Sequence, residues 1–413
     1  MRLRFPFLLC AGAACALQAG AVDLDAAIQK NRTGTLVIQT KPGAKVQVEQ
    51  LRHEFWFGAT VPTGMFTGRT SAEDIAKLNE IFKSHFNAGV IEAAFKWHDM
   101  ERERGVVNYA TVDAMLRWAD GAGIPLRGHC IYWGIPNRVQ PWLKELSDDE
   151  LRRDLQQRGR TIGIRYRDRF AEYDLNNEMI HANYYEQRLG DGITKQMAEW
   201  VKDGDPNAKL FVNDYDITTG NRLDDYVKHI RKLLDMGVPL EGIGVQGHLH
   251  GDSFDPAALQ NSLDVLAQFK LPIRITEFNF PGQRSKYYRN EDARKSVLTA
   301  EEEQAKAAAL REFFRICFAH PAVTGIMMWG FWEGANWIPQ SSLYKRDWTP
   351  TPAALAYDDL VLKQWWTRWS GTADAKGRAE VPAFFGRHRV TVDGKEMTVE
   401  FKRSEGRMTV VLE

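Results

Sequence analysis

The chain has 413 residues, and its 54 Lys and Arg residues balance 54 Asp and Glu residues, so the formal net charge is zero. A chain of this length with 44% hydrophobic residues can bury a large core, which excludes a disordered protein and a miniprotein. The balanced charge gives no general attraction to nucleic acid or to an anionic membrane, so we expect neither as a partner. Tryptophan occurs 13 times, and since a buried indole N–H needs a hydrogen-bond acceptor, we expect some of these side chains to line a groove.

The first 21 residues have the order of a secretory signal peptide. Two arginines precede an apolar run at 5–17, and small residues end the segment at Ala21. The apolar run is too short for a permanent transmembrane helix, and no later uninterrupted apolar stretch reaches about 18 residues. We therefore expect cleavage near Ala21 and a protein secreted to the periplasm or the exterior, without stable membrane insertion.

The cysteines do not form a recognisable disulfide framework or metal site. Cys10 and Cys15 lie in the predicted signal peptide, and lipidation of Cys15 is an alternative that its preceding residues support only weakly. Cys130 and Cys317 lie in apolar segments, so we expect buried thiols, with a disulfide between them as the alternative.

Between residues 54 and 370, eight β-rich runs alternate with helical stretches. Start signals precede several of these helices, at Ser71, Ser147, Asp255 and Thr299. The strand ends follow one another at intervals of 29 to 52 residues, compatible with the roughly 31 residues per unit of an eight-unit barrel. This pattern predicts a (β/α)8 barrel. The expected strands are 55–61, 88–92, 126–132, 170–175, 209–213, 242–247, 273–276 and 325–329.

The segments on either side of the barrel alternate like β-strands. Residues 34–52 alternate around a Pro-Gly turn, which predicts a hairpin, and 387–402 alternate around Asp393-Gly394, a typical hairpin turn. A further strand is expected at 408–412. Because an isolated hairpin is marginally stable, we expect the segments 22–53 and 371–413 to join in one small β-sheet beside the barrel.

Two carboxylates follow expected strands in the barrel. Glu178 and Glu277 are 99 residues apart, about three strand–helix units, so they can face each other across the mouth of the barrel. Two facing carboxylates among Trp, Asn, Gln and His suit acid/base chemistry on a neutral polar substrate with flat apolar faces, such as a sugar. Separations of about 5–5.5 Å or about 6.5–9.5 Å would indicate retention or inversion, and the residues alone leave both open.

Three motifs lie at or near these carboxylates: YDLNNEM at 173–179, GIGVQGH at 242–248 and ITEFN at 275–279. They resemble the motifs of glycoside hydrolase family 10, the retaining β-1,4-xylanases. Further matches extend the resemblance over most of 54–365, and residues 176–190 are similar to the branch found in plants and related bacterial proteins. The resemblance implies retaining hydrolysis of internal β-1,4-xylosidic linkages. We expect no cofactor, xylan or xylo-oligosaccharides as the substrate, and a monomer.

The resemblance also implies roles for individual residues. Glu178 would be the general acid/base and Glu277 the nucleophile, with Asn177 bonding the sugar 2-OH and His248 orienting Glu277. The remaining substrate-binding residues would hold the sugar or flank the carboxylates: Glu92, Lys96, His129, Trp133, Tyr215, Gln246, Trp329 and Trp337.

Two departures from the family pattern concern the substrate. Ala93 stands where the family usually has Asn, and residues 134–136 read Gly-Ile-Pro instead of His-Ser-Gln. Alternative functions are therefore cleavage of another β-glycoside or of branched xylan, and glycan binding without catalysis. His248-Leu249-His250 resembles the metal-binding pair of amidohydrolase barrels, but that motif belongs on the first strand. For Trp332, the sequence leaves two positions open, packing in the core and lining of the groove.

Overall fold

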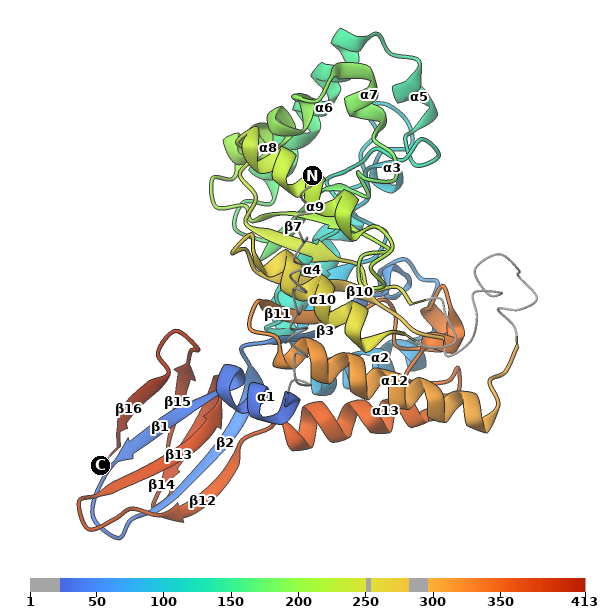
Figure 1. Ribbon diagram of the computed structural model, residues 1–413. Helices are drawn as coiled ribbons and strands as arrows, with labels where there is room; N and C mark the ends of the chain where they lie inside the picture. Colours follow the sequence, from blue (N-terminus) through green and yellow to red (C-terminus); the bar gives the residue numbers. More distant parts are fainter. Residues whose placement is uncertain (1–22, 250–253, 282–295, 413) are drawn as a thin grey trace, which may run out of the picture.

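The computed structural model describes residues 23–249, 254–281 and 296–412 (Figure 1). Eight parallel strands form a ring in chain order, and the last of them pairs with the first, so the barrel is closed. The expected (β/α)8 barrel is thereby confirmed. Its strands are β3 (Trp56–Val61), β4 (Ala88–Ile91), β5 (Leu126–Gly128), β7 (Glu172–Asn177), β8 (Leu210–Asp214), β9 (Gly242–Val245), β10 (Ile273–Phe278) and β11 (Val323–Met328).

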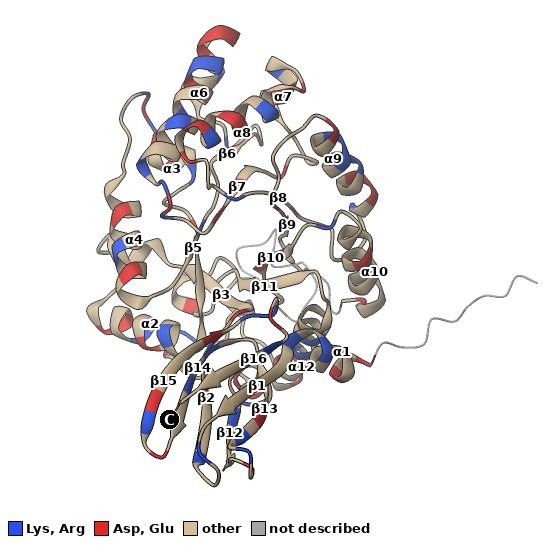
Figure 2. Cartoon of the chain, turned by 90° about the vertical axis from the view of Figure 1, so that its left-hand side faces the viewer, with Lys and Arg blue, Asp and Glu red and all other residues tan. Residues whose placement is uncertain are grey.

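The third strand is interrupted after Gly128 and resumes as β6 (Tyr132–Trp133), which pairs with the end of β7. Helices surround the ring, with both charge signs interspersed along them (Figure 2). The predicted caps Ser71, Ser147, Asp255 and Thr299 each accept a backbone N–H bond at a helix start. The longer helices are α2 (Ala72–His85), α4 (Ala110–Ala122), α6 (Asp148–Arg165), α8 (Ile193–Gly204), α9 (Leu223–Asp235), α10 (Pro256–Ala267) and α12 (Ala300–Ala319).

Shorter helical segments lie mostly in the connections. They are η1 (Thr63–Phe66), α3 (Trp97–Met100), α5 (Pro141–Lys144), α7 (Tyr184–Leu189), η3 (Glu333–Ala335), η4 (Pro339–Ser341) and α13 (Pro352–Tyr357), which continues as η5 (Asp358–Gln364). None of the described helices is both long and apolar enough to span a bilayer.

The barrel core explains why its strands are apolar on both faces. Residues of one face pack against the helices, while Ala88, Val90 and Met327 form a separate cluster with Trp329. Parallel strands are covered on both faces, so their side chains are buried whichever face they point toward. Cys130 and Cys317 are buried free thiols, as expected, and no disulfide joins them.

The N- and C-terminal segments associate beside the barrel, but they form two sheets rather than the single sheet that we expected. One has the strand order β13-β1-β16 and the other β12-β2-β14-β15. Their facing sides share an apolar core that includes Leu36, Val46, Val390 and Phe401, so the appendage is a β-sandwich. The strands are β1 (Thr33–Gln39), β2 (Lys45–His53), β12 (Arg368–Thr372), β13 (Arg378–Phe384), β14 (Gly386–Val392), β15 (Lys395–Phe401) and β16 (Arg407–Val411).

The hairpin predicted for residues 34–52 is also wrong. Strands β1 and β2 have the expected positions, but the chain crosses from one sheet to the other between them. Either arrangement buries the same alternating residues, so alternation could not distinguish them. The hairpin at Asp393-Gly394 is confirmed, since β14 pairs with β15 around two residues of positive φ. Helix α1 (Leu24–Arg32) was not predicted, because only Ile28 and Arg32 of its nine residues are buried.

Candidate active site

A cleft of about 610 Å³ lies at the carboxyl ends of the barrel strands, where active sites of this fold are built. Of the twelve predicted site residues, ten line it, and only Glu92 and Asn177 do not. The ten are Lys96, His129, Trp133, Glu178, Tyr215, Gln246, His248, Glu277, Trp329 and Trp337.

Glu178 directly follows β7 and is half-buried beside the cleft. Its backbone has a φ of 63°, an uncommon conformation for a residue with a side chain. One carboxylate oxygen accepts the indole N–H of Trp133 at 2.9 Å, and the other accepts Nε2 of Gln246 at 3.0 Å. Burial raises the pKa of Glu178, the Gln246 bond partly opposes this rise, and the negative charge of Glu277 adds to it. The net upward shift favours a carboxyl that holds its proton.

Glu277 lies on β10 and is only 4% exposed. Its oxygens accept Nδ2 of Asn213 at 2.9 Å and Nε2 of His248 at 3.1 Å, while Nδ1 of His129 lies 3.9 Å away. Burial alone would raise the pKa of Glu277, but His129, the His248 bond and Lys96 together outweigh it and lower the pKa to about 2. Glu277 is therefore ionised at neutral pH, whereas the pKa of Glu178 is shifted in the opposite direction.

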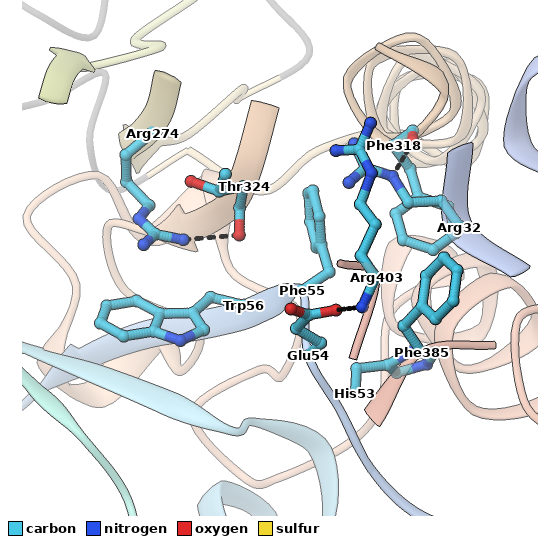
Figure 3. Close-up of a pocket in the computed structure, with 10 residues that line it drawn as sticks. All are labelled: Arg32, His53, Glu54, Phe55, Trp56, Arg274, Phe318, Thr324, Phe385 and Arg403. Atoms are coloured by element: carbon cyan, nitrogen blue, oxygen red, sulfur yellow. Dashed lines mark hydrogen bonds between the residues drawn. The ribbon is translucent and has the colours of Figure 1, made fainter. Parts of the chain in front are cut away.

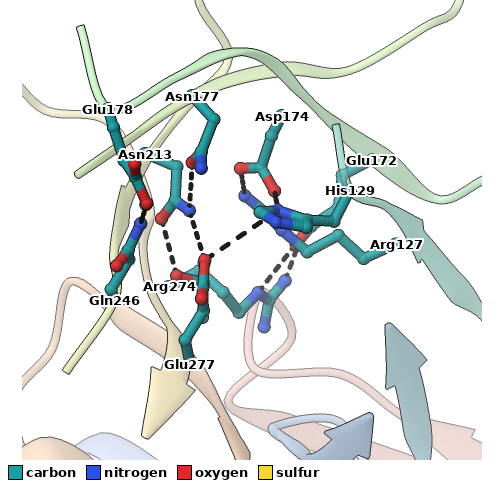
Figure 4. Close-up of polar contacts among 12 residues, drawn as sticks. Arg127, His129, Glu172, Asp174, Asn177, Glu178, Asn213, Gln246, Arg274 and Glu277 are labelled. Carbon is teal, nitrogen blue, oxygen red and sulfur yellow. Dashed lines mark hydrogen bonds and ion pairs between the residues drawn. The ribbon is translucent and has the colours of Figure 1, made fainter. Parts of the chain in front are cut away.

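Asn213 joins three of the strands beneath the cleft (Figure 4). Its Oδ1 accepts the hydroxyl of Thr276 at 2.6 Å, which directs its Nδ2 toward both Glu277 and Oδ1 of Asn177. Asn177 is 1% exposed, and its Nδ2 has no protein acceptor among the described residues. A buried donor without a partner is costly, so this amide is a candidate donor to a substrate.

A chain of buried charges supports His129 from below (Figure 4). Nδ1 of His129 lies 2.8 Å from Oδ2 of Asp174, which also pairs with the fully buried guanidinium of Arg127. Arg127 pairs in turn with Glu172, and Glu172 with Arg274 at 3.0 Å. Each buried charge has an opposite partner, so removing one carboxylate would leave a buried cation poorly compensated.

Aromatic and cationic side chains form another part of the wall. The ammonium of Lys96 lies 4.9 Å from the ring centre of Trp133 and 5.6 Å from that of Trp329. The ring of His248 meets that of Trp337 edge-on, with 5.4 Å between the centroids. Flat apolar faces beside a few polar groups are typical of sites that bind small polar ligands.

Six cleft residues were missed as site residues. All six come from the loops after β6, β7 and β8. Ile135 and His181 lie in segments that were compared with the family, whereas the other four had only their proximity to a strand end as a signal. The ring of His181 stacks on that of Tyr215 with 3.5 Å between the centroids, and the guanidinium of Arg138 lies over Trp133. The six are Ile135, Asn137, Arg138, His181, Asp216 and Arg222.

The structure also bears on several residues outside the predicted set of site residues. Trp332 is buried and stacks on Trp348 at 4.5 Å, so it packs in the core and is not part of the groove. Asp214 is buried and accepts the backbone N–H of Ile180, so it supports the loop after β7. The predicted signal peptide and His250 lie outside the described residues. Across the described part of the chain, no group of His, Cys, Asp and Glu has the geometry to hold a metal ion.

Comparison with known proteins identifies the relatives of this fold and site. Over 350 residues the chain is 34% identical to the anti-sigma-I factor RsgI6 of Acetivibrio thermocellus, covering 84% of this chain and 42% of that protein. It is 35% identical over 325 residues to endo-1,4-beta-xylanase 3 of Arabidopsis thaliana, covering 78% of this chain and 39% of that protein. The chain thus spans about two-fifths of the length of these curated relatives.

Solved structures agree on the fold. Native xylanase 10B from Thermotoga maritima superposes with a TM-score of 0.66 and 23% identity, covering 75% of this chain and 96% of that one. The family model for glycosyl hydrolase family 10 matches residues 50–360, which include the barrel and every residue of the cleft. The chain therefore belongs to glycosyl hydrolase family 10.

Proposed function

We propose that this protein hydrolyses internal β-1,4-xylosidic bonds of xylan with retention of the anomeric configuration. The observation that carries the proposal is the pair of carboxylates in one cleft whose pKa values are shifted in opposite directions, up for Glu178 and down for Glu277. Such a pair provides an acid and a nucleophile at the same pH. Relatives named endo-1,4-beta-xylanases support xylan as the substrate.

In the first step, Glu277 attacks the anomeric carbon while Glu178 gives its proton to the departing glycosidic oxygen. The carbon–oxygen bond to the leaving sugar breaks as an ester bond to Glu277 forms. Esterification removes the negative charge of Glu277, which contributes to the raised pKa of Glu178. The pKa of Glu178 then falls, so its carboxylate can take a proton from the water that releases the sugar.

The surrounding side chains position the sugar in this scheme. The free Nδ2 of Asn177 would donate to the 2-OH, where hydrogen bonds strengthen in the transition state. Lys96 and His129 would bind hydroxyls on the non-reducing side, with Trp329 and Trp337 against the apolar ring face. Glu92 lies outside the cleft lining, so its part would be to pair with Lys96.

The test combines stereochemistry with leaving-group dependence. The first product seen by NMR should be the β-anomer of a xylo-oligosaccharide, whereas an α-anomer would contradict retention. Glu178→Gln should abolish turnover of xylan yet still be glycosylated by an aryl xylobioside with a good leaving group, which needs little protonation. Glu277→Gln should be inactive on both. Glu80→Gln, an exposed surface glutamate, is the matched control and should behave like the wild type.

A second candidate function is glycan binding without catalysis. It is supported by the 34% identical relative, whose name, anti-sigma-I factor, is that of a regulatory protein. Tight binding of xylohexaose by the wild type without any turnover would favour this candidate. A metal-dependent reaction is a weaker alternative, which loss of activity on treatment with EDTA would support.

We also propose export of the protein as a monomer. The charged, apolar and small-residue order of residues 1–21 supports export, and sequencing of the purified protein should place its N-terminus near Val22. An intact Met1 in protein isolated from the native host would contradict cleavage. Light scattering should give the mass of one chain.

A further inference from the structure

A second cavity, of about 240 Å³, lies at the opposite end of the barrel, where the sandwich meets the amino ends of the strands (Figure 3). The barrel, α1, α12 and the sandwich all contribute to its wall. No role in the proposed reaction accounts for it, because the catalytic cleft opens at the carboxyl ends of the same strands. The lining residues are Arg32, His53, Glu54, Phe55, Trp56, Arg274, Phe318, Thr324, Phe385 and Arg403.

The most unusual lining group is the guanidinium of Arg32, which is 6% exposed. It donates to the carbonyl oxygens of Phe318, His320 and Val323 at 2.5 to 2.8 Å, and these acceptors carry no net charge. Among the described residues Arg32 forms no ion pair, although the charge of Glu54 attracts it from a longer distance. A buried cation normally has an opposite charge beside it.

A second cation adds to this imbalance. Arg403 comes from the loop after β15, and its guanidinium donates to the carbonyl oxygen of Pro321 at 2.7 Å, again a neutral acceptor. Burial lowers the pKa of Arg32 to about 9, and the positive charge of Arg403 contributes to the same shift. The positive charges of the two guanidiniums therefore repel each other at this cavity.

The remaining charges do not cancel this pair. Arg274 is already matched, because its Nε and one Nη bond the carboxylate of Glu172, while its other Nη donates to the carbonyl oxygen of Thr324 at 2.6 Å. Among the described residues of the lining Glu54 is the sole acidic one, and it accepts the backbone N–H of Arg403 at 2.8 Å. The cavity therefore keeps one positive charge in excess.

Aromatic rings form the other walls. The guanidinium of Arg32 lies 4.7 Å from the ring centre of Phe55, and that of Arg274 lies 3.9 Å from that of Trp56. Nε and one Nη of Arg32 are taken by the three carbonyl oxygens, so its other Nη is the group left to bond an anion. The volume far exceeds the roughly 10–15 Å³ that a water molecule needs, so it accommodates a small organic molecule.

We propose that this cavity binds a small aromatic carboxylate. Its anionic end meets Arg32 and Arg403, and its ring packs among Phe55, Phe318 and Phe385. The ligand would supply the missing negative charge and would join the sandwich to the barrel, since Arg403 belongs to one and Arg32 contacts α12 of the other. The proposal is independent of the proposed hydrolysis.

The test is calorimetric titration of the full chain with benzoate at constant ionic strength, with neutral benzamide as the isosteric control. We expect one saturable benzoate site and no benzamide binding. Arg403→Gln should weaken benzoate about tenfold or more, the loss of one charge-assisted contact. Arg407→Gln, an exposed sandwich arginine paired with Glu380 outside the cavity, should change nothing.

A variant that is expected to strengthen benzoate binding distinguishes an effect on binding from a loss of folding. Glu54→Gln removes the competing negative charge, so benzoate should bind several-fold more tightly, a gain that partial unfolding cannot produce. The proposal is overturned if benzoate does not bind, or if benzamide or inorganic phosphate binds equally well. It is also overturned if Arg403→Gln or Glu54→Gln leaves the benzoate affinity unchanged.

Discussion

Replacing Gln246 by Met tests how the cleft controls the proton on Glu178. Nε2 of Gln246 bonds Oε1 of Glu178 at 3.0 Å, and this contact is the largest influence that lowers the pKa of Glu178. A hydrogen bond to a charged group is worth about 1.5–3 kcal/mol, and one pKa unit corresponds to about 1.4 kcal/mol. Because Glu178 is half-buried and solvent weakens the contact, we take the lower end, about 1.5 kcal/mol.

The assay is the pH dependence of kcat/KM on an aryl xylobioside with a poor leaving group, whose alkaline limb reports the protonation of the general acid in the free enzyme. Gln246→Met should move that limb toward alkaline pH, because it removes a bond that favours the charged carboxylate. In Glu178→Gln, whose residual activity is measured on the same substrate, that limb should disappear, which identifies it with Glu178. An alkaline limb that stays in place or moves toward acid in Gln246→Met would refute the assigned role of the Gln246 bond.

Two further predictions concern the buried charges. Asp174→Asn leaves the buried guanidinium of Arg127 short of a partner and should cost about 3–5 kcal/mol of unfolding free energy in urea titrations. Asp113→Asn, which breaks an exposed pair with Arg165, should cost less than about 1 kcal/mol, and equal losses would show that burial is not the cause. Glu277 has its pKa lowered from 4.5 to about 2, so its contribution to stability is full above 4.5 and is lost as the pH falls toward 2. Over that range the unfolding free energy of the wild type should fall by about 3 kcal/mol more than that of Glu277→Gln. Parallel curves of unfolding free energy against pH for the two proteins would contradict this linkage.

The barrel could be predicted because its signals are local and repeat eight times. Each β-rich run is followed by a capped helix, as at Ser147 and Thr299, where both capping boxes form. The sandwich was only partly predictable. Alternation located β1 and β2 but could not tell a hairpin from a crossing between sheets, since the facing residues Leu36 and Val46 are buried in either case.

The site was predictable to the extent that motifs marked it. Glu178 and Glu277 lie in motifs with family-typical neighbours, whereas Arg138 and Arg222 come from loops whose path depends on tertiary packing. The second cavity gave no local signal at all. Its excess charge arises because Arg32 and Arg403, from opposite ends of the chain, meet only in the folded protein.

The most direct test of the proposed reaction is to trap its covalent intermediate. A 2-fluoro xylobioside with a dinitrophenyl leaving group should form the glycosyl-enzyme quickly and hydrolyse it slowly, so the adduct accumulates. After trypsin digestion, mass spectrometry should place the fluorosugar on the peptide 275–284, in which Glu277 is the sole carboxylic side chain. An adduct on any other peptide, or steady hydrolysis without an adduct, would contradict Glu277 as the nucleophile.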